Sequence, residues 1–130
     1  MDVIGVSSQR RRQLIDITSF GQEAVAASDV AEGVCHVFVP HTIAALTLNE
    51  NADPTVPQDL LEAFEKMLPP VQWRHSEGNS DAHFLSTVIG ASVHVPISEG
   101  ELRLGRWQAV YFVELDGPRR REVWVTCLGG

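Results

Sequence analysis

Lysine is almost absent from this chain: of its ten lysine and arginine residues, only Lys66 is a lysine. A lone lysine inside an apparent amphipathic helix argues against a Schiff-base enzyme and against a phosphate-binding P-loop. No apolar run approaches the roughly 20 residues of a membrane span. The segment Met1–Ser8 also lacks the apolar stretch of a secretory signal. We therefore expect a cytoplasmic protein with no membrane partner.

Cysteine and positive charge are also scarce. Cys35 and Cys127 lie in apolar, strand-like runs, and neither has the CxxC spacing of a metal or redox motif. The two could pair, but without a secretory segment we expect buried free thiols. The 17 acidic and 10 basic residues give a formal net charge of −7, which argues against a nucleic-acid partner.

The rest of the composition is that of one soluble domain. The chain has 130 residues, of which 44% are hydrophobic, and this length buries about two-thirds of the unfolded surface. Arginine is suited to planar, two-bond recognition of carboxylate or phosphate. The clusters Arg10–Arg12 and Arg119–Arg121 therefore favour a small phosphorylated ligand or another anion as a partner.

The hydrophobic periodicity predicts a single α+β domain over residues 1–130, with residues 1–9 as an irregular N-terminal segment. Strands are predicted over Arg12–Thr18, Val34–Val39, Leu46–Leu48, Ser92–Ile97, Trp107–Leu115 and Glu122–Leu128. The run Val34–Val39 is continuously apolar apart from His36, which is typical of a strand covered on both faces. The turn residues Asp116–Gly117–Pro118 predict a hairpin between the last two strands.

Three segments carry helical signals. The first starts at a capping box formed by Ser19 and Gln22. The second is capped by Asp53 and stopped by Pro69-Pro70, and the third covers Asn79–Ile89. This order of elements favours mostly antiparallel sheets with two or three helices.

The most polar stretch is RHSEGNSDAH, residues 74–83, which cannot build an apolar core. It holds His75 and His83, and imidazole together with carboxylate suits Zn²⁺ and similar divalent ions. A solvated loop that happens to carry two histidines is the alternative. The two residues are eight apart, so they converge only if Gly78 lets the chain fold back.

His41 is the third candidate ligand, because it follows a buried strand, where ligand-bearing loops tend to emerge. Three neutral imidazoles, from His41, His75 and His83, would hold a divalent metal, Zn²⁺ or Mg²⁺, and leave one position open. His36 and His94 lie within strands instead, and we expect them in core, surface or subunit contacts.

Arg119 follows the Asp116–Pro118 turn, where its planar fork suits an anion, although a solvated charge explains it equally well. Arg120 and Arg121 should point to opposite faces of a strand, so the three arginines cannot all serve one pocket. Asn79 and Asp81 could belong to a ligand site, but they are explained equally well as caps of the following helix. A capping residue can still orient a metal-binding histidine.

Three segments in register carry a family resemblance: PHTIAALTLNENADPTVPQDL (residues 40–60), RHSEGNSDAH (74–83) and LGRWQAVYFVELDGPRRREVWV (104–125). Together they resemble the YjbQ family, also called UPF0047, over nearly all of the chain from about Leu14 onward. The resemblance implies a small α+β domain that forms a homotrimer. It also implies a weak, secondary thiamine-phosphate synthase activity, a transferase reaction that joins a pyrimidine diphosphate to a thiazole phosphate.

The resemblance also implies roles for individual residues. Catalysis and charge neutralisation would fall to His41, Glu77, Asp81 and Arg119. Ligand contacts would fall to Thr42, Asn51 and Asn79, and metal binding to His41, His75 and His83. The sequence departs from the family pattern at three places. Ile43 replaces a hydroxyl residue, Arg106 replaces a small polar one, and residues 84–87 lack the lysine that often follows His83. A non-catalytic metal- or small-ligand-binding module and a metal-dependent hydrolase would use the same residues and stay open as alternatives.

Overall fold

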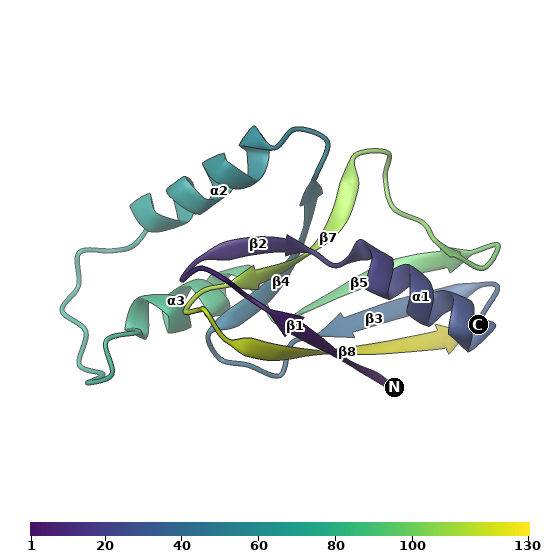
Figure 1. Cartoon of the computed structure of the whole chain (residues 1–130), viewed down its shortest axis with the longest axis horizontal. Helices are drawn as coiled ribbons and strands as arrows, with labels where there is room; N and C mark the ends of the chain where they lie inside the picture. Colours follow the sequence, from purple (N-terminus) through teal and green to yellow (C-terminus); the bar gives the residue numbers. More distant parts are fainter.

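A computed structural model describes all residues from Met1 to Gly130, in eight strands and three helices (Figure 1). In chain order these are β1 (Asp2–Ser7), β2 (Gln13–Asp16), α1 (Thr18–Ser28), β3 (Gly33–Phe38), β4 (Ala44–Glu50), α2 (Thr55–Lys66), α3 (Ser80–Ile89), β5 (Ser92–Ser98), β6 (Glu101–Leu102), β7 (Gln108–Glu114) and β8 (Arg120–Gly129). The predicted single α+β domain with antiparallel sheets is confirmed.

The strands form two sheets, one with five strands in the order β1-β8-β3-β5-β6 and one with three in the order β2-β7-β4. Every pair of neighbours is antiparallel. Strands β1 to β4 alternate between the two sheets along the chain, and so do β7 and β8. The chain therefore crosses from one sheet to the other between each of these successive strands.

The main core lies between α1, one face of the five-stranded sheet and the three-stranded sheet, which contributes Leu46 and Phe112. Ala24 and Val25 of α1 are buried in the same cluster as Cys35 and Val37 of β3. The helix approaches the sheet edge closely at Gly21, where an added Cβ would lie 3.0 Å from Leu102 Cδ1. Both cysteines are free thiols, but only Cys35 is buried, whereas Cys127 is partly exposed.

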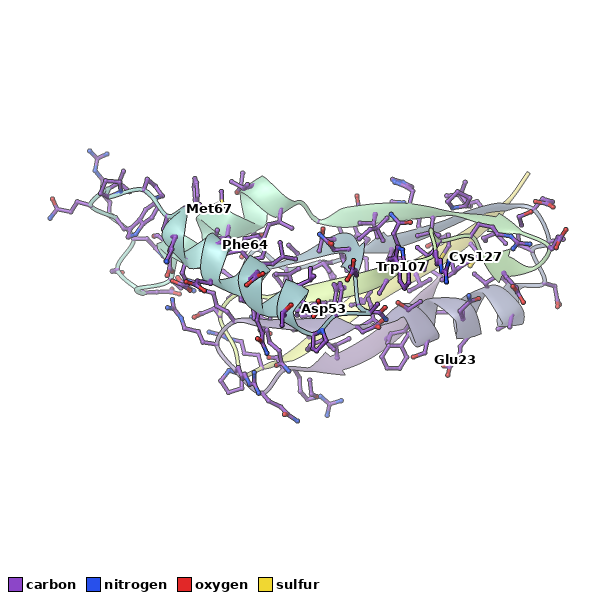
Figure 2. All side chains as sticks on the ribbon, turned by 90° about the horizontal axis from the view of Figure 1, so that it is seen from above. Glu23, Asp53, Phe64, Met67, Trp107 and Cys127 are labelled. Atoms are coloured by element: carbon purple, nitrogen blue, oxygen red, sulfur yellow. The ribbon has the colours of Figure 1, made fainter.

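A second, smaller core lies between α3 and the three-stranded sheet. Ala82 and Leu85 of α3 are buried there beside Ile43, which explains why an apolar residue is accommodated at that position. Ser86 Oγ donates a hydrogen bond to the carbonyl of Ala44 at the start of β4, 2.8 Å away. Figure 2 shows α2 from above, and Phe64 on this helix packs against the same core.

Two predicted features at the chain ends are wrong. The segment 1–9 is not irregular, because β1 pairs with β8 along its whole length and buries Val6. The Asp116–Pro118 turn does not make a hairpin, because β7 and β8 belong to different sheets. Each partner strand is distant in sequence, so local turn signals could not identify it.

Two local predictions fail as well. The capping box does not form: the N-terminus of α1 has no side-chain cap, and Gln22 Oε1 accepts a hydrogen bond from the Leu102 amide instead. Strand β3 is covered on one face only, since Cys35 and Val37 are buried whereas Val34 is exposed on the other. None of the three helices combines the length and the apolar character needed to cross a membrane.

Candidate functional site

The polar run 74–83 folds back on itself at the start of α3. Gly78 has a φ of 79°, a left-handed conformation that glycine adopts without strain. The turn brings His75 and His83 together, with ring centroids 5.4 Å apart and planes at 83°. The turn therefore brings together two of the three histidines that were expected at one site.

Asn79, immediately before α3, is buried, and only one of its two side-chain polar atoms has a hydrogen-bond partner. Its exposed fraction is 7%, and Nδ2 donates a 3.3 Å hydrogen bond to Asp116 Oδ2. Oδ1 is sealed from solvent and has no partner within the chain. A flipped amide would turn oxygen toward a carboxylate, so the orientation is the favourable one. Oδ1 is thus a buried acceptor without a donor or a cation, which is rare in native proteins.

Asp81, in the first turn of α3, is held by two arginines. Its carboxylate accepts hydrogen bonds from Arg11 Nη2 at 3.1 and 3.0 Å and from Arg12 Nη2 at 2.6 Å. Partial burial raises the pKa of Asp81, but the Ala82 amide and the two arginine charges outweigh it and hold the pKa below its ordinary value. Asp81 therefore stays ionised and anchors α3 through its ion pairs with the two arginines. A carboxylate with a lowered pKa is poorly suited to transfer a proton near pH 7.

Asp116 holds Arg119 in a similar way. Arg119 donates from Nε to the Asp116 carbonyl at 3.0 Å and from Nη2 to Oδ2 at 3.3 Å, while Arg11 Nε donates to Oδ1 at 3.3 Å. Burial raises the pKa of Asp116, but the hydrogen bonds from Asn79 and Arg11 outweigh it and lower the pKa. The Arg119 guanidinium thus uses two of its nitrogens in hydrogen bonds to Asp116 in the same turn.

His41 lies in a different place, beside the start of β8. Its Nε2 accepts a hydrogen bond from the Glu122 amide at 2.9 Å. Burial first, and then the charge of Arg121, lower the pKa of His41 below its ordinary value. The ring is therefore neutral near pH 7, and because Nε2 accepts, the proton sits on Nδ1.

The histidines thus occupy two positions rather than one. No three His, Cys, Asp or Glu side chains are placed to hold a metal together, so His41 does not complete a three-histidine group with His75 and His83 in one chain. His36 and His94 face each other across β3 and β5, with ring centroids 4.6 Å apart. They lie in strands, as the sequence predicted.

The remaining candidates are spread over the surface. Glu77 is exposed, and its Oε2 lies 4.0 Å from His75 Nε2. Thr42 is exposed next to His41. Asn51 follows the last residue of β4 and donates a 2.8 Å hydrogen bond to Asp16 Oδ2. The contact of α3 is at the other end of this strand, at Ala44.

Sequence reasoning missed a buried charged network between the two sheets. Arg121 donates from Nε and Nη2 to the Glu114 carboxylate, and Ser8 Oγ donates to Glu114 Oε1 at 2.7 Å. Burial raises the pKa of Glu114, but the Arg121 and Ser8 hydrogen bonds outweigh it and lower the pKa. A glutamate between Val113 and Leu115 was the signal, yet Arg121 lies on a strand of the other sheet and Ser8 lies just after β1.

Comparison with family models matches residues 2–130 to the family described as UPF0047 protein YjbQ-like. A UPF0047 protein of Methanocaldococcus jannaschii is 42% identical over 95% of this chain and 91% of its own length. YugU of Bacillus subtilis, also described as a UPF0047 protein, is 38% identical over 99% of both chains.

Solved structures show the same fold. An uncharacterized YjbQ/UPF0047-family protein from Clostridium acetobutylicum superposes with a TM-score of 0.95 at 43% identity, over 98% of this chain and 100% of that chain. A conserved hypothetical protein from Thermus thermophilus gives a TM-score of 0.90 at 42% identity, over 98% and 100%.

Proposed function

Because the chain belongs to the YjbQ-like UPF0047 family, we propose that the cluster at the start of α3 binds a divalent cation and serves chemistry on a small phosphorylated substrate. One observation carries this proposal: the buried, partnerless Oδ1 of Asn79 lies one helical turn before His83, whose ring faces His75. A buried acceptor of this kind favours a cation or a hydrogen-bond donor as its missing partner.

The donor set fits a divalent ion in its chemistry. Two imidazoles and one amide oxygen provide three protein groups, which leaves room for water or a substrate oxygen. The nearby carboxylates of Asp81 and Asp116 are already neutralised by arginine. Imidazole favours Zn²⁺ over Mg²⁺, which prefers carboxylate and water oxygens. A bound ion would act as a Lewis acid toward phosphoryl oxygen.

The proposed reaction is of the thiamine-phosphate synthase type, in which a pyrimidine diphosphate joins a thiazole phosphate and pyrophosphate leaves. Most of the assistance that this reaction needs is electrostatic stabilisation of the leaving group. Glu77 is the one carboxylate of the cluster that no arginine contacts, so it is the group that can orient His75 or accept a proton. Arg119 provides an exposed cation beside Asn79 and Asp116.

The experiment compares two histidine variants of protein prepared without a His tag. We expect about one metal ion per chain in the wild type, loss of that metal in His83→Ala, and no loss in His94→Ala, the control, a histidine of β5 outside segment 74–83. Turnover is assayed with both thiamine precursors and with a panel of phosphoesters. A wild type that binds no added Zn²⁺ or Mg²⁺ would contradict the metal site.

The same experiment separates the alternatives. Saturable metal binding without turnover of either substrate set favours a non-catalytic metal- or small-ligand-binding module. Turnover of phosphoesters alone favours a metal-dependent hydrolase that uses bound water as the nucleophile. Turnover of the two precursors that His83→Ala abolishes and His94→Ala retains favours the transferase.

The proposal includes assembly into a homotrimer. It is supported by the uncovered face of the five-stranded sheet, where Val34 and Leu128 are 37% and 59% exposed. On the same face Phe38 stacks on Trp124, with ring centroids 5.7 Å apart. Exposed apolar patches on soluble chains commonly mark contact surfaces, and a cyclic assembly would cover this one.

A further inference from the structure

A second polar pocket lies beside β1, β8 and the loop after β3. Its volume is about 370 Å³, and it is lined by Val3, Gly5, His41, Arg120, Arg121 and Glu122. It is separate from the His75–His83 pair, since none of its lining residues comes from segment 74–83. Arg120 and Arg121 line it and Arg119 does not, in agreement with the prediction that the three arginines cannot all serve one pocket.

Three residues that line this pocket carry hydrogen-bond donors that the protein leaves unused. Arg121 directs Nε and Nη2 to Glu114, which leaves Nη1 without a hydrogen bond although it is not sealed from solvent. Arg120 is exposed and forms no ion pair within the chain. His41 uses Nε2 as an acceptor, so its Nδ1 carries a proton that it can donate.

The pocket is open because β1 contributes a glycine at this position. Gly5 pairs with Glu122, and an added Cβ at Gly5 would lie 3.8 Å from Arg120 Nη2. A longer side chain there would grow into the space next to the guanidinium. The absence of a side chain at Gly5 therefore leaves room for a ligand beside Arg120.

The charges around the pocket favour an anion. Glu114 neutralises the buried charge of Arg121 and fixes its guanidinium in place. The Glu122 carboxylate accepts a 3.0 Å hydrogen bond from Trp124 Nε1, which directs Oε1 along the strand. Arg120 is thus a cation without a partner, next to two fixed N–H donors. Several N–H donors with at least one full positive charge suit a phosphoryl group.

We propose that this pocket binds the phosphoryl group of a phosphomonoester or diphosphate, with Arg120, Arg121 Nη1 and His41 Nδ1–H as its donors. The inference deepens the proposed function and rests on it for the identity of the ligand, because it assigns a place to the phosphate of the substrate. Phosphate binding here needs no metal, so it can be measured without one.

The test is an NMR titration of the ¹⁵N-labelled full chain with inorganic phosphate and pyrophosphate, in the presence of a chelator. We expect saturable shifts at His41 and Glu122 in the wild type. Arg120→Ala and His41→Phe should each weaken binding about tenfold or more, because each removes a charge-assisted or directed hydrogen bond. Arg10→Ala is the matched control: it removes an exposed arginine outside the pocket and should change affinity less than about twofold.

Three results would overturn the proposal. The first is the absence of saturable shifts at pocket residues, and the second is an equal loss of affinity in Arg10→Ala and Arg120→Ala. The third is binding centred on residues 74–83. The chelator separates this test from the metal site, because His83→Ala should bind phosphate as the wild type does. If the chain binds phosphate but no metal, the phosphate pocket is supported and the proposed metal site is contradicted.

Discussion

Arg121 and Glu114 form a two-bond ion pair between β8 and β7, with Nε–Oε1 at 3.0 Å and Nη2–Oε2 at 2.6 Å. The exposed fractions are 7% for Arg121 and 0% for Glu114. Because β7 and β8 belong to different sheets, the pair ties the sheets together where the chain crosses between them. It also holds Arg121 beside His41, so the stability of the fold and the geometry of the pocket depend on the same contact.

Glu114→Ala should lower the free energy of unfolding by about 3–5 kcal/mol, because it leaves the buried Arg121 charge uncompensated. Chemical denaturation followed by circular dichroism measures the change. The double variant Glu114→Leu/Arg121→Met removes both charges and should cost much less. Equal losses in the two variants would show that packing rather than charge pairing matters here.

Asn79→Ala should weaken metal binding about 10–100-fold. It should change the stability of the metal-free chain by only about 1 kcal/mol, because it removes a single 3.3 Å hydrogen bond. Isothermal titration with Zn²⁺ gives the affinity. Asn51→Ala is the control, since it removes a 2.8 Å hydrogen bond to Asp16 away from the cluster. Unchanged Zn²⁺ affinity in Asn79→Ala would remove the amide oxygen from the proposed ligand set.

Trp124→Glu should convert the proposed trimer to monomers, because it places a charge on the uncovered apolar face of the five-stranded sheet. Trp107→Glu is the control: Trp107 is 54% exposed and stacks only with Arg106, 4.8 Å from its ring. Sedimentation velocity at micromolar concentration distinguishes the states. A wild type that sediments as a monomer, or a Trp124→Glu variant that stays trimeric, would contradict the assignment of this face.

Local patterns account for most of the elements and for one half of the candidate site. Alternation and turn residues predicted β7, β8 and α3, and Gly78 predicted the turn that brings His75 and His83 together. These features depend on residues close in sequence, for which periodicity and backbone preference are informative.

Apart from the capping box, the errors concern contacts that the topology brings together. Strand β1 pairs with β8 across more than a hundred residues, and Gly5 interrupts its apolar pattern. Glu114 stands out as a charge in an apolar strand. Arg121 is only seven residues away, but the pair forms because the chain crosses from one sheet to the other between them. The placement of His41 by Glu122 is of the same kind, because the hydrogen bond joins two strand ends in space. Such pairings depend on topology rather than on spacing.

The titration of His41 tests the pocket directly. Burial and Arg121 lower its pKa below the ordinary value of 6.5. Between the folded pKa and 6.5 the unfolded chain binds a proton that the folded chain does not. His41 therefore makes the fold less stable as pH falls through this interval, and it has no such effect well above 6.5. His41→Phe should remove this part of the pH dependence of the unfolding free energy.

Phosphate should change that titration in a defined direction. A bound anion favours the protonated ring, so the pKa of His41 should rise when phosphate is added. NMR of ring-labelled histidine, recorded without metal, measures the pKa and shows which nitrogen holds the proton. In the phosphate-free chain we expect the proton on Nδ1, because Nε2 accepts from the Glu122 amide. A proton on Nε2 would contradict that hydrogen bond, and an unchanged pKa at saturating phosphate would place the anion away from His41.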